Sequence, residues 1–349
     1  MTVSKGVILA GSSPGRPPFG AGVPAPLAPV ANRPIVTHAV ERLRAAGVAD
    51  VAVVSAPALE GDLERALRGL DTRQLRLSGG RDLAGALRAA APFVGDDPFV
   101  LQTGDGLLGH EVEPFADVAA GDGPDTVLLV HRDPEIGDTE RLDSRRMLRM
   151  ADVEVDPAGL AVAGVSLFGP GALGRAQTLL QDRAQVTRLA DVVEVLWRAG
   201  GHVHVRMVRS WRRYDGDGQN LLDLNRMVLE GLETDREPAV GEGTRVQGRV
   251  VVDPTATVRA SIIRGPVIIG ARAQVEDAYI GPYTSIGADV RVQGAEIEHS
   301  IVLDGASIFH LGERLEASIV GRGARVFRDF SLPRAMRLHV GDGVEVALC

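Results

Sequence analysis

Two glycine-containing segments of the chain lie where a bound phosphate or metal ion would be expected. Gly11 follows the apolar run Val7–Ala10, and Gly104-Asp105-Gly106 comes shortly after the apolar run Phe99–Leu101. Both runs predict buried strands of a parallel sheet, and ligands of such sheets bind beyond the carboxyl ends of the strands. Glycine lets the backbone approach a ligand closely, and a carboxylate is a ligand that Mg²⁺ prefers. These segments are therefore the first candidates for a binding site.

The surrounding sequence predicts the elements that would position this edge of the sheet. Apolar residues recur with helical spacing over 34–46, 59–70, 83–91, 187–199 and 221–232, and short apolar strands are predicted at 51–55, 127–130 and 164–168. Strands that alternate with helices in this way predict an α/β fold, a Rossmann-like, mostly parallel sheet with helices on both faces. We expect this domain to cover residues 1–235 and a charged, turn-forming linker to follow at 236–245.

A second domain is predicted by apolar residues that recur every 17 positions, with steps of six, six and five residues inside each period. The three series are Val246, Ile263, Ile280 and Ile297; Val252, Ile269, Ile286 and Leu303; and Val258, Val275, Val292 and Phe309. Hexapeptide-type repeats of β-branched residues are typical of short strands on the three faces of a prism. We therefore expect a left-handed parallel β-helix over 246–330, with a repeat that weakens after Phe309 and a tail at 331–349. Glycines are expected at its corners.

Composition narrows the class of partner. The net charge of −8 disfavours a nucleic-acid partner, since phosphate backbones bind basic surfaces. No apolar run approaches the roughly 18 residues of a membrane span, and the short apolar run before Gly11 does not resemble a signal peptide. Cys349 is the single cysteine, so no disulfide forms within the chain. We expect a cytoplasmic protein without a nucleic-acid or membrane partner.

Several motifs make the chain similar to sugar-1-phosphate nucleotidylyltransferases, and most of all to the long form of glucose-1-phosphate thymidylyltransferases, which carries a C-terminal β-helix. The motifs are Gly6-Val7-Ile8-Leu9-Ala10-Gly11, Pro29-Val30-Ala31-Asn32-Arg33-Pro34, Gly104-Asp105, Ala163-Gly164-Val165, Leu221-Leu222-Asp223-Leu224-Asn225, and the β-helix segments Ile263–Gly270, Tyr279–Gly287 and Ala295–Ser300. The resemblance implies a reaction that joins a nucleoside triphosphate to a sugar phosphate with Mg²⁺ and releases pyrophosphate. It also implies a homo-oligomer that assembles through the β-helix.

The phosphate-binding motifs of the resemblance are altered. Where the family has Gly-Gly-x-Gly-Thr-Arg-Leu, this chain has Gly11-Ser12-Ser13-Pro14-Gly15-Arg16-Pro17. Gly11, Gly15 and Arg16 remain as candidate phosphate ligands, and Arg16 is the candidate catalytic cation. Pro14 removes a backbone N–H from this loop. Where the family has Pro-Lys, this chain has Pro24-Ala25, and the loss of one such contact with developing charge commonly costs on the order of 10²–10³ in rate.

The base and sugar motifs are altered as well. The base-reading segment, Gln-x-x-Pro-x-Gly-Leu-Ala in the family, becomes Ser78-Gly79-Gly80-Arg81-Asp82-Leu83-Ala84, in which Gly79 and Gly80 are the candidate nucleotide contacts. The resemblance places Gly164 and Gln185 at the sugar phosphate, with Gln185 at a position where the family has glutamate.

A metal pair is the remaining candidate. Asp105 matches the first carboxylate of the family site, and Asp215 is the candidate for the second, although straight alignment puts Tyr214 there and Asp217 is an alternative. Two carboxylates at strand ends would suit octahedral Mg²⁺. Solvated acidic residues of a turn are an equal alternative. Arg212 and Arg213 beside Trp211 could contact a phosphate or form a surface charge pair.

Three functional hypotheses follow. In the first, the transfer activity is lost or strongly weakened, and the protein keeps weak nucleotide or sugar-phosphate binding or acts as a structural or regulatory partner of an active paralogue. In the second, a functioning enzyme acts on an unusual sugar or cyclitol phosphate and uses Arg16 or another cation in place of the lysine. In the third, the chain is a non-catalytic assembly module. Saturable, Mg²⁺-dependent nucleotide binding would favour an enzyme over a scaffold.

Overall fold

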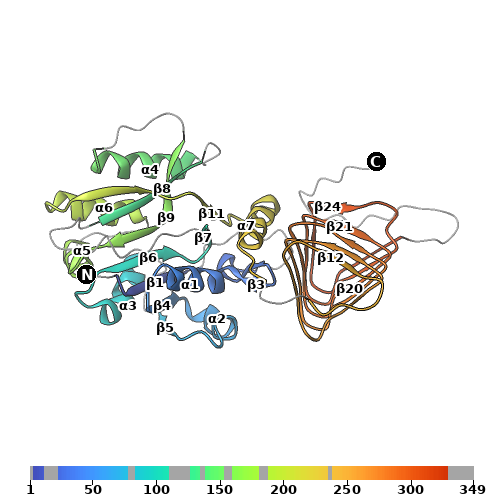
Figure 1. Cartoon of the computed structure of the whole chain (residues 1–349). Helices are drawn as coiled ribbons and strands as arrows, with labels where there is room; N and C mark the ends of the chain where they lie inside the picture. The colour runs from blue at the N-terminus through green and yellow to red at the C-terminus, as the bar shows by residue number, and fades with distance from the viewer. Residues whose placement is uncertain are drawn as a thin grey trace.

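The computed structural model describes residues 3–11, 23–77, 83–109, 126–133, 138–152, 159–180, 188–234 and 238–328. Its first part is built on a seven-stranded sheet (Figure 1). In spatial order the strands are β10 (Val203–Met207), β8 (Thr126–Arg132), β9 (Leu160–Phe168), β6 (Phe99–Thr103), β1 (Lys5–Ala10), β4 (Asp50–Ser55) and β5 (Thr72–Arg76). Strand β9 runs antiparallel to both neighbours and the other pairs are parallel. The prediction of a mostly parallel sheet is confirmed.

Helices cover both faces of this sheet, because alternate side chains of its buried strands point to opposite faces. On β1, Ile8 joins the core under α1 (Ile35–Ala45), α2 (Glu60–Ala66) and α7 (Gly218–Glu230). Its neighbour Val7 joins a second core, under α3 (Leu83–Val94), α5 (Ala172–Leu180) and α6 (Leu189–Arg198). The shorter elements are the 3-10 turns η1 (Ala25–Leu27) and η2 (Pro57–Leu59), the hairpin β2 (Pro29–Val30) and β3 (Arg33–Pro34), and the pair β7 (Gly106–Leu108) and β11 (Trp211–Arg213).

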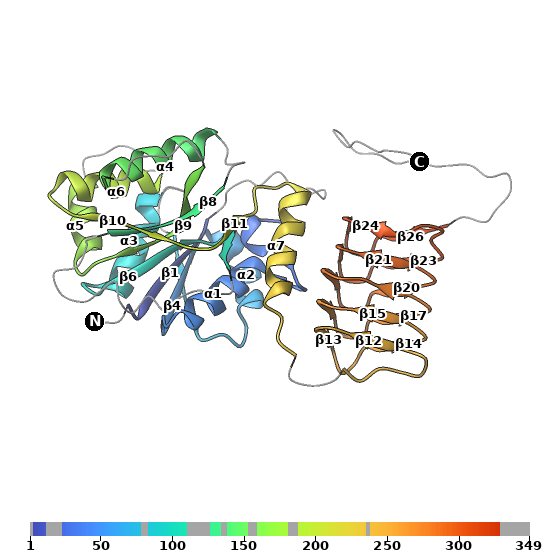
Figure 2. The same cartoon turned by 45° about the horizontal axis from the view of Figure 1, so that its top comes forward.

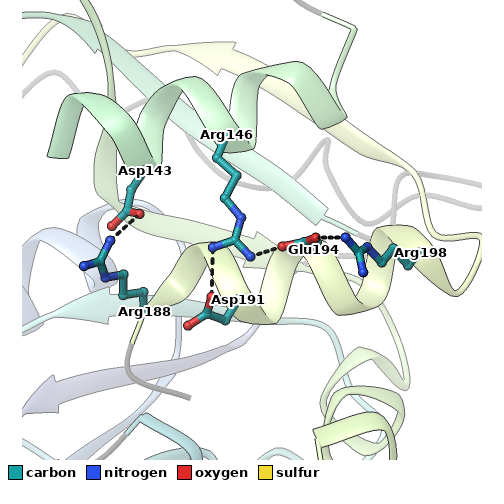
Figure 3. Close-up of polar contacts among 6 residues, drawn as sticks. All are labelled: Asp143, Arg146, Arg188, Asp191, Glu194 and Arg198. Atoms are coloured by element: carbon teal, nitrogen blue, oxygen red, sulfur yellow. Dashed lines mark hydrogen bonds and ion pairs between the residues drawn. The ribbon is translucent and has the colours of Figure 1, made fainter. Parts of the chain in front are cut away.

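Helix α4 (Asp138–Met150) packs on α6 through both apolar and charged contacts. Figure 3 shows the charged part, in which Arg146 of α4 reaches Asp191 and Glu194 of α6. Arg146 Nη1 lies 2.9 Å from Asp191 Oδ1, and Arg198 also pairs with Glu194. Arg188 pairs with Asp143 at 3.0 Å. These pairs hold α4 in register along α6.

The second part of the chain is a left-handed parallel β-helix, as predicted. Each of its three faces is a five-stranded parallel sheet, and the turns stack as Figure 2 shows. The first face has β12 (Arg245–Gln247), β15 (Ile262–Arg264), β18 (Tyr279–Ile280), β21 (Glu296–Glu298) and β24 (Leu315–Glu316). The second has β13 (Val250–Val252), β16 (Val267–Ile269), β19 (Thr284–Ile286), β22 (Ile301–Val302) and β25 (Ile319–Val320). The third has β14 (Thr257–Arg259), β17 (Gln274–Glu276), β20 (Arg291–Gln293), β23 (Ser307–Phe309) and β26 (Arg325–Phe327).

The last members of two predicted series are wrong by one residue. Ile286 pairs with Val302, not Leu303, and Val292 pairs with Ile308, not Phe309. Val302 and Ile308 are fully buried in the β-helix core. The cause is the corner between β21 and β22, which is one residue shorter than the corner between β18 and β19. A one-residue shift exchanges the inward and outward faces of a strand, so Leu303 packs against the α/β domain instead.

The β-helix continues one turn beyond the point where the sequence repeat weakens. Strands β24, β25 and β26 pair in parallel with β21, β22 and β23. The step into this turn is 18 residues, as in the pairing of Val302 with Val320, which is why the 17-residue period no longer detects it. Some corners require glycine as expected, since a Cβ on Gly270 would lie 2.9 Å from the backbone of the next turn. Other corners carry non-glycine residues with positive φ, such as Arg272 and Asp289.

The second face of the β-helix packs against α7 (Figure 2). Paired positions on its outward side carry Ile268, Ser285, Ile301 and Ile319, and the three isoleucines contact the core of the α/β domain. Asn225 of α7 is fully buried there. Its Oδ1 accepts hydrogen bonds from the Ala31 N–H at 2.8 Å and the Ser285 hydroxyl at 3.0 Å, and its Nδ2 donates to the Tyr283 carbonyl at 3.0 Å.

The described helices include none that is long and apolar enough to cross a membrane.

Candidate functional site

The structure describes four of the nine predicted site residues: Gly11, Asp105, Gly164 and Asp215. The other five, Gly15, Arg16, Gly79, Gly80 and Gln185, lie outside the described residues.

Gly11 and Asp105 lie at the same edge of the sheet. Strands β1 and β6 are parallel neighbours, with Leu9 opposite Thr103, and the Gly104 N–H donates to the Leu9 carbonyl at 2.9 Å. A Cβ on Gly104 would lie 3.0 Å from that carbonyl oxygen, so the close approach of the two chain segments requires glycine. The expectation that these two segments meet at the carboxyl ends of their strands is confirmed.

Asp105 is buried and its two carboxylate oxygens differ in environment. Oδ2 accepts a hydrogen bond from Arg213 Nε at 2.8 Å. Oδ1 is buried and has no hydrogen-bond partner, and the same holds for the Thr103 hydroxyl two residues earlier. An unsatisfied buried acceptor is costly, about 1–3 kcal/mol and more for a charged group. The ion pair with Arg213 therefore supplies the compensation for the buried charge of Asp105.

Strand β11 brings Arg213 to this position. It pairs antiparallel with β7, with Arg213 opposite Gly106, and the next residue, Tyr214, donates its N–H to the Asp105 carbonyl at 2.8 Å. Tyr214 is buried. Burial, then the nearby Asp215 and Asp217, raise the pKa of the Tyr214 phenol to about 12. A neutral tyrosine thus lies opposite Asp105 in the strand pair.

Asp215, the second candidate metal ligand, is exposed and engaged in its own turn. Its carboxylate accepts the Asp217 N–H at 3.0 Å. Asp217 is in turn the N-cap of α7, where its carboxylate accepts the Gln219 N–H at 3.4 Å. Both groups therefore satisfy backbone donors at the start of α7, a common use of aspartate. Across the described ranges, no three histidine, cysteine or acidic side chains come together as a set that could hold a metal ion.

The donors around Asp105 therefore do not fit a Mg²⁺ ion well. One oxygen of Asp105 is held by a guanidinium group, and one oxygen of the exposed Asp215 accepts a turn N–H. Mg²⁺ in proteins usually draws on one or two carboxylates together with substrate phosphates, and a cation at Asp105 Oδ1 would lie close to the positive charge of Arg213, which is already on the same carboxylate.

Gly164 lies on β9 beside Thr103, and the structure gives a packing reason for this glycine. A Cβ here would lie 2.4 Å from the Thr103 hydroxyl oxygen and 2.5 Å from the Trp211 ring. The same ring would lie 2.3 Å from a Cβ on Gly106. The buried indole of Trp211 thus fills the space that both glycines leave, and it anchors β11 over the sheet edge.

Ala25 takes the position that the resemblance assigns to the phosphate-binding lysine. It begins the short turn η1 and is 1% exposed. Its methyl group belongs to the hydrophobic core beneath α1, α2 and α7. Position 25 therefore contributes packing, and no charge, to this part of the molecule.

The sequence pointed to this edge of the sheet but did not identify the pairing of Arg213 with Asp105. The sequence signal is Trp211-Arg212-Arg213, which predicts either a phosphate contact or a surface charge pair. Only the pairing of β7 with β11 distinguishes the two arginines, because it aligns Arg213 with Gly106, next to Asp105.

Comparison with known proteins gives a consistent result. Residues 5–135 match the family model described as nucleotidyl transferase. The chain is 33% identical over 326 residues to the glucose-1-phosphate thymidylyltransferase of Streptomyces griseus, covering 90% of this chain and 91% of the relative. It is also 33% identical over 358 residues to the enzyme of the same name from Streptomyces antibioticus, covering 99% of both. The low-salt glycan biosynthesis nucleotidyltransferase Agl11 of Haloferax volcanii is 29% identical over 357 residues, 99% of this chain and 100% of that one.

The solved structures agree on the fold. A crystal structure described provisionally as a glucose-1-phosphate thymidylyltransferase from Bacillus anthracis aligns with a TM-score of 0.52 at 20% identity, over 63% of this chain and 93% of that one. At this identity the likeness supports the fold alone. The near full-length sequence matches carry the assignment: the chain belongs to the sugar-1-phosphate nucleotidylyltransferase family.

Proposed function

We propose that this family member has lost, or retains only strongly weakened, transfer activity, and that it binds nucleoside triphosphate or sugar phosphate weakly at most. Ala25 is the observation that carries the proposal. Nucleotidyl transfer develops negative charge on phosphate oxygens, and cations that are positioned in advance stabilise this charge. A methyl group that is 1% exposed in a hydrophobic core supplies none.

The neighbourhood of Asp105 supports the same proposal. Its carboxylate is neutralised by Arg213 at 2.8 Å, and the Asp215 carboxylate binds the Asp217 N–H. The loss of one electrostatic contact typically costs on the order of 10²–10³ in rate. A site with no lysine at position 25 and with a guanidinium group on its first candidate carboxylate is therefore expected to be several orders of magnitude slower than an intact family site.

The remaining function would then lie in assembly. We propose a homo-oligomer formed through the β-helix, or a structural or regulatory partnership with an active paralogue. The support is that five turns of the β-helix and its contact with α7 are intact, while the substitutions concentrate in phosphate, base and sugar motifs.

A divergent active enzyme is the second candidate, and one observation favours it. The two Streptomyces relatives named as glucose-1-phosphate thymidylyltransferases match over 90% and 99% of this chain, so no part of the family architecture is missing from the alignment. In that case Arg16 or another cation would replace the lysine, Mg²⁺ would be required, and the substrate would be an unusual sugar or cyclitol phosphate.

Pyrophosphate release separates the two candidates. Purified protein is incubated with Mg²⁺, glucose-1-phosphate and each common nucleoside triphosphate in turn, and nucleotide binding is measured in parallel by calorimetry. We expect no turnover above background. Clear turnover by the wild-type protein with any triphosphate would refute the loss of activity. A sugar-phosphate panel extends the assay to the divergent-enzyme candidate.

An Ala25→Lys variant tests whether the missing lysine is the reason for the expected absence of turnover. Ala28, also buried and three residues away in the same turn, offers a matched control, Ala28→Lys. Turnover in Ala25→Lys but not in Ala28→Lys would show that the rest of the site is competent and that position 25 alone is responsible. Thermal melts of both variants establish whether each still folds.

A further inference from the structure

Arg213 and Asp105 form an ion pair at the edge of the sheet. Arg213 Nε lies 2.8 Å from Asp105 Oδ2, and the side chains are 40% and 9% exposed respectively. An aspartate buried to this extent requires a compensating charge or hydrogen-bond donors; the guanidinium group supplies the charge and a donor for Oδ2, while Oδ1 has no hydrogen-bond partner. Because Arg213 is 40% exposed, solvent reaches one side of the pair.

The backbone around Arg213 is anchored on both sides. Trp211, which is 6% exposed, packs into the space left by Gly106 and Gly164. Tyr214, which is 4% exposed, donates its N–H to the Asp105 carbonyl. With the backbone fixed on both sides, the Arg213 side chain starts from a defined position beside Asp105. This distinguishes the pair from the mobile ion pairs of exposed surfaces, which contribute little.

The same pair competes with a divalent cation for Asp105. A cation bound to this carboxylate would lie within a few ångströms of the guanidinium, and two positive charges at that distance repel strongly in a partly buried site. Asp215 is exposed and one of its oxygens accepts the Asp217 N–H, so any cation that it held through the other oxygen would still face the charge of Arg213 at Asp105. We propose that Arg213 acts as a tethered replacement for the divalent cation, so that Asp105 does not bind Mg²⁺ in the wild-type protein. This inference deepens the proposed function and rests on it for the identity of the site.

The chain offers a matched control beside Arg213. Arg212 lies on the same strand, opposite Leu107, and is exposed. Arg212→Gln and Arg213→Gln change the net charge equally, but only the second removes the partner of Asp105. A general effect of net charge on metal affinity would therefore appear in both variants, whereas an effect of the ion pair with Asp105 would appear only in Arg213→Gln.

Mn²⁺ binding to the full chain, followed by electron paramagnetic resonance of free Mn²⁺, is the test. We expect no binding by the wild-type protein or by Arg212→Gln in the concentration range where Arg213→Gln binds. The gain in Arg213→Gln should be about tenfold or more in affinity, since a neighbouring like charge has been removed. The double variant Arg213→Gln/Asp105→Asn should lose this gain, because Asp105 supplies the ligand oxygens.

Two results would overturn the proposal. One is equal Mn²⁺ affinity in the wild-type protein and Arg213→Gln. The other is wild-type binding that Asp105→Asn abolishes, a comparison that holds even if Arg213→Gln fails to fold. This experiment measures metal binding and not turnover, so it is independent of the test of the proposed function. Pyrophosphate release without Mn²⁺ binding at Asp105 would refute the loss of activity but would leave the proposed role of Arg213 in place.

Discussion

Replacing Asn225 by leucine should uncouple the two parts of the molecule. Asn225 is fully buried between α7 and the β-helix and uses both ends of its amide. Its oxygen accepts from the Ala31 N–H and the Ser285 hydroxyl, and its nitrogen donates to the Tyr283 carbonyl. Leucine has a similar size and no polar atoms, so the substitution removes hydrogen bonds with little change in volume.

The expected loss of stability follows from the hydrogen-bonding groups that Asn225→Leu leaves without a partner. Ala31 and Ser285 are 3% and 0% exposed, so water cannot readily replace the lost amide. A buried polar group left without a partner costs about 1–3 kcal/mol. Two such groups and the carbonyl of the half-buried Tyr283, offset by the burial of an apolar side chain, give a loss of about 3–6 kcal/mol in the free energy of unfolding. This is a large part of the stability of a typical domain.

Urea unfolding followed by circular dichroism measures the loss, and limited proteolysis between α7 and β12 measures the separation of the two parts. Ser285→Ala is the matched control, because it removes one of the three hydrogen bonds and should cost only about 1 kcal/mol. A change in Asn225→Leu of less than about 0.5 kcal/mol, the range of neutral surface substitutions, would refute the reasoning. So would equal losses in the two variants.

Three further predictions concern pH, the α4 contact and the β-helix register. Burial, the largest cause, lowers the pKa of His38 from 6.5 to about 4, so the folded protein keeps this imidazole neutral while the unfolded chain takes up a proton below pH 6.5. The contribution of His38 to the free energy of unfolding should therefore be complete above pH 6.5 and fall by about 3 kcal/mol as the pH drops to 4. Urea unfolding at several pH values should show that the free energy of unfolding changes less with pH in His38→Gln than in the wild-type protein. An equal change with pH in both proteins would contradict the lowered pKa of His38. Arg146→Leu leaves Glu194, which is 12% exposed, with fewer partners, and should lower the free energy of unfolding by about 1–3 kcal/mol, whereas a melting temperature equal to that of the wild-type protein would show that the pair contributes nothing. Val302→Asp should prevent the β-helix from folding, while Leu303→Asp should weaken only its contact with the α/β domain, and circular dichroism of both variants tests this. If instead Leu303→Asp prevents folding and Val302→Asp does not, Leu303 would be the inward residue, as the strict 17-residue period predicts.

Local periodicity explains how much of the fold could be predicted. Strand and helix spacings record which face of each element is buried, and the alternation of the two predicted the α/β sheet. The β-helix was predictable for the same reason, since each turn repeats the last. The prediction failed where a single corner became shorter by one residue, at Val302. Val302-Leu303 and Ile308-Phe309 are both pairs of apolar neighbours, so the apolar pattern fits either register.

The sequence alone determined the class of fold, the edge of the sheet where Gly11 and Asp105 meet, and the absence of a lysine at position 25. Tertiary structure decided what surrounds these residues. Asp105 and Arg213 are 108 residues apart, and Asn225 and Ala31 are 194 apart. Contacts across such distances depend on strand pairing and domain packing, which local patterns do not encode. The sequence could therefore mark Asp105 only as a candidate metal ligand, and only the fold could place a guanidinium group on it.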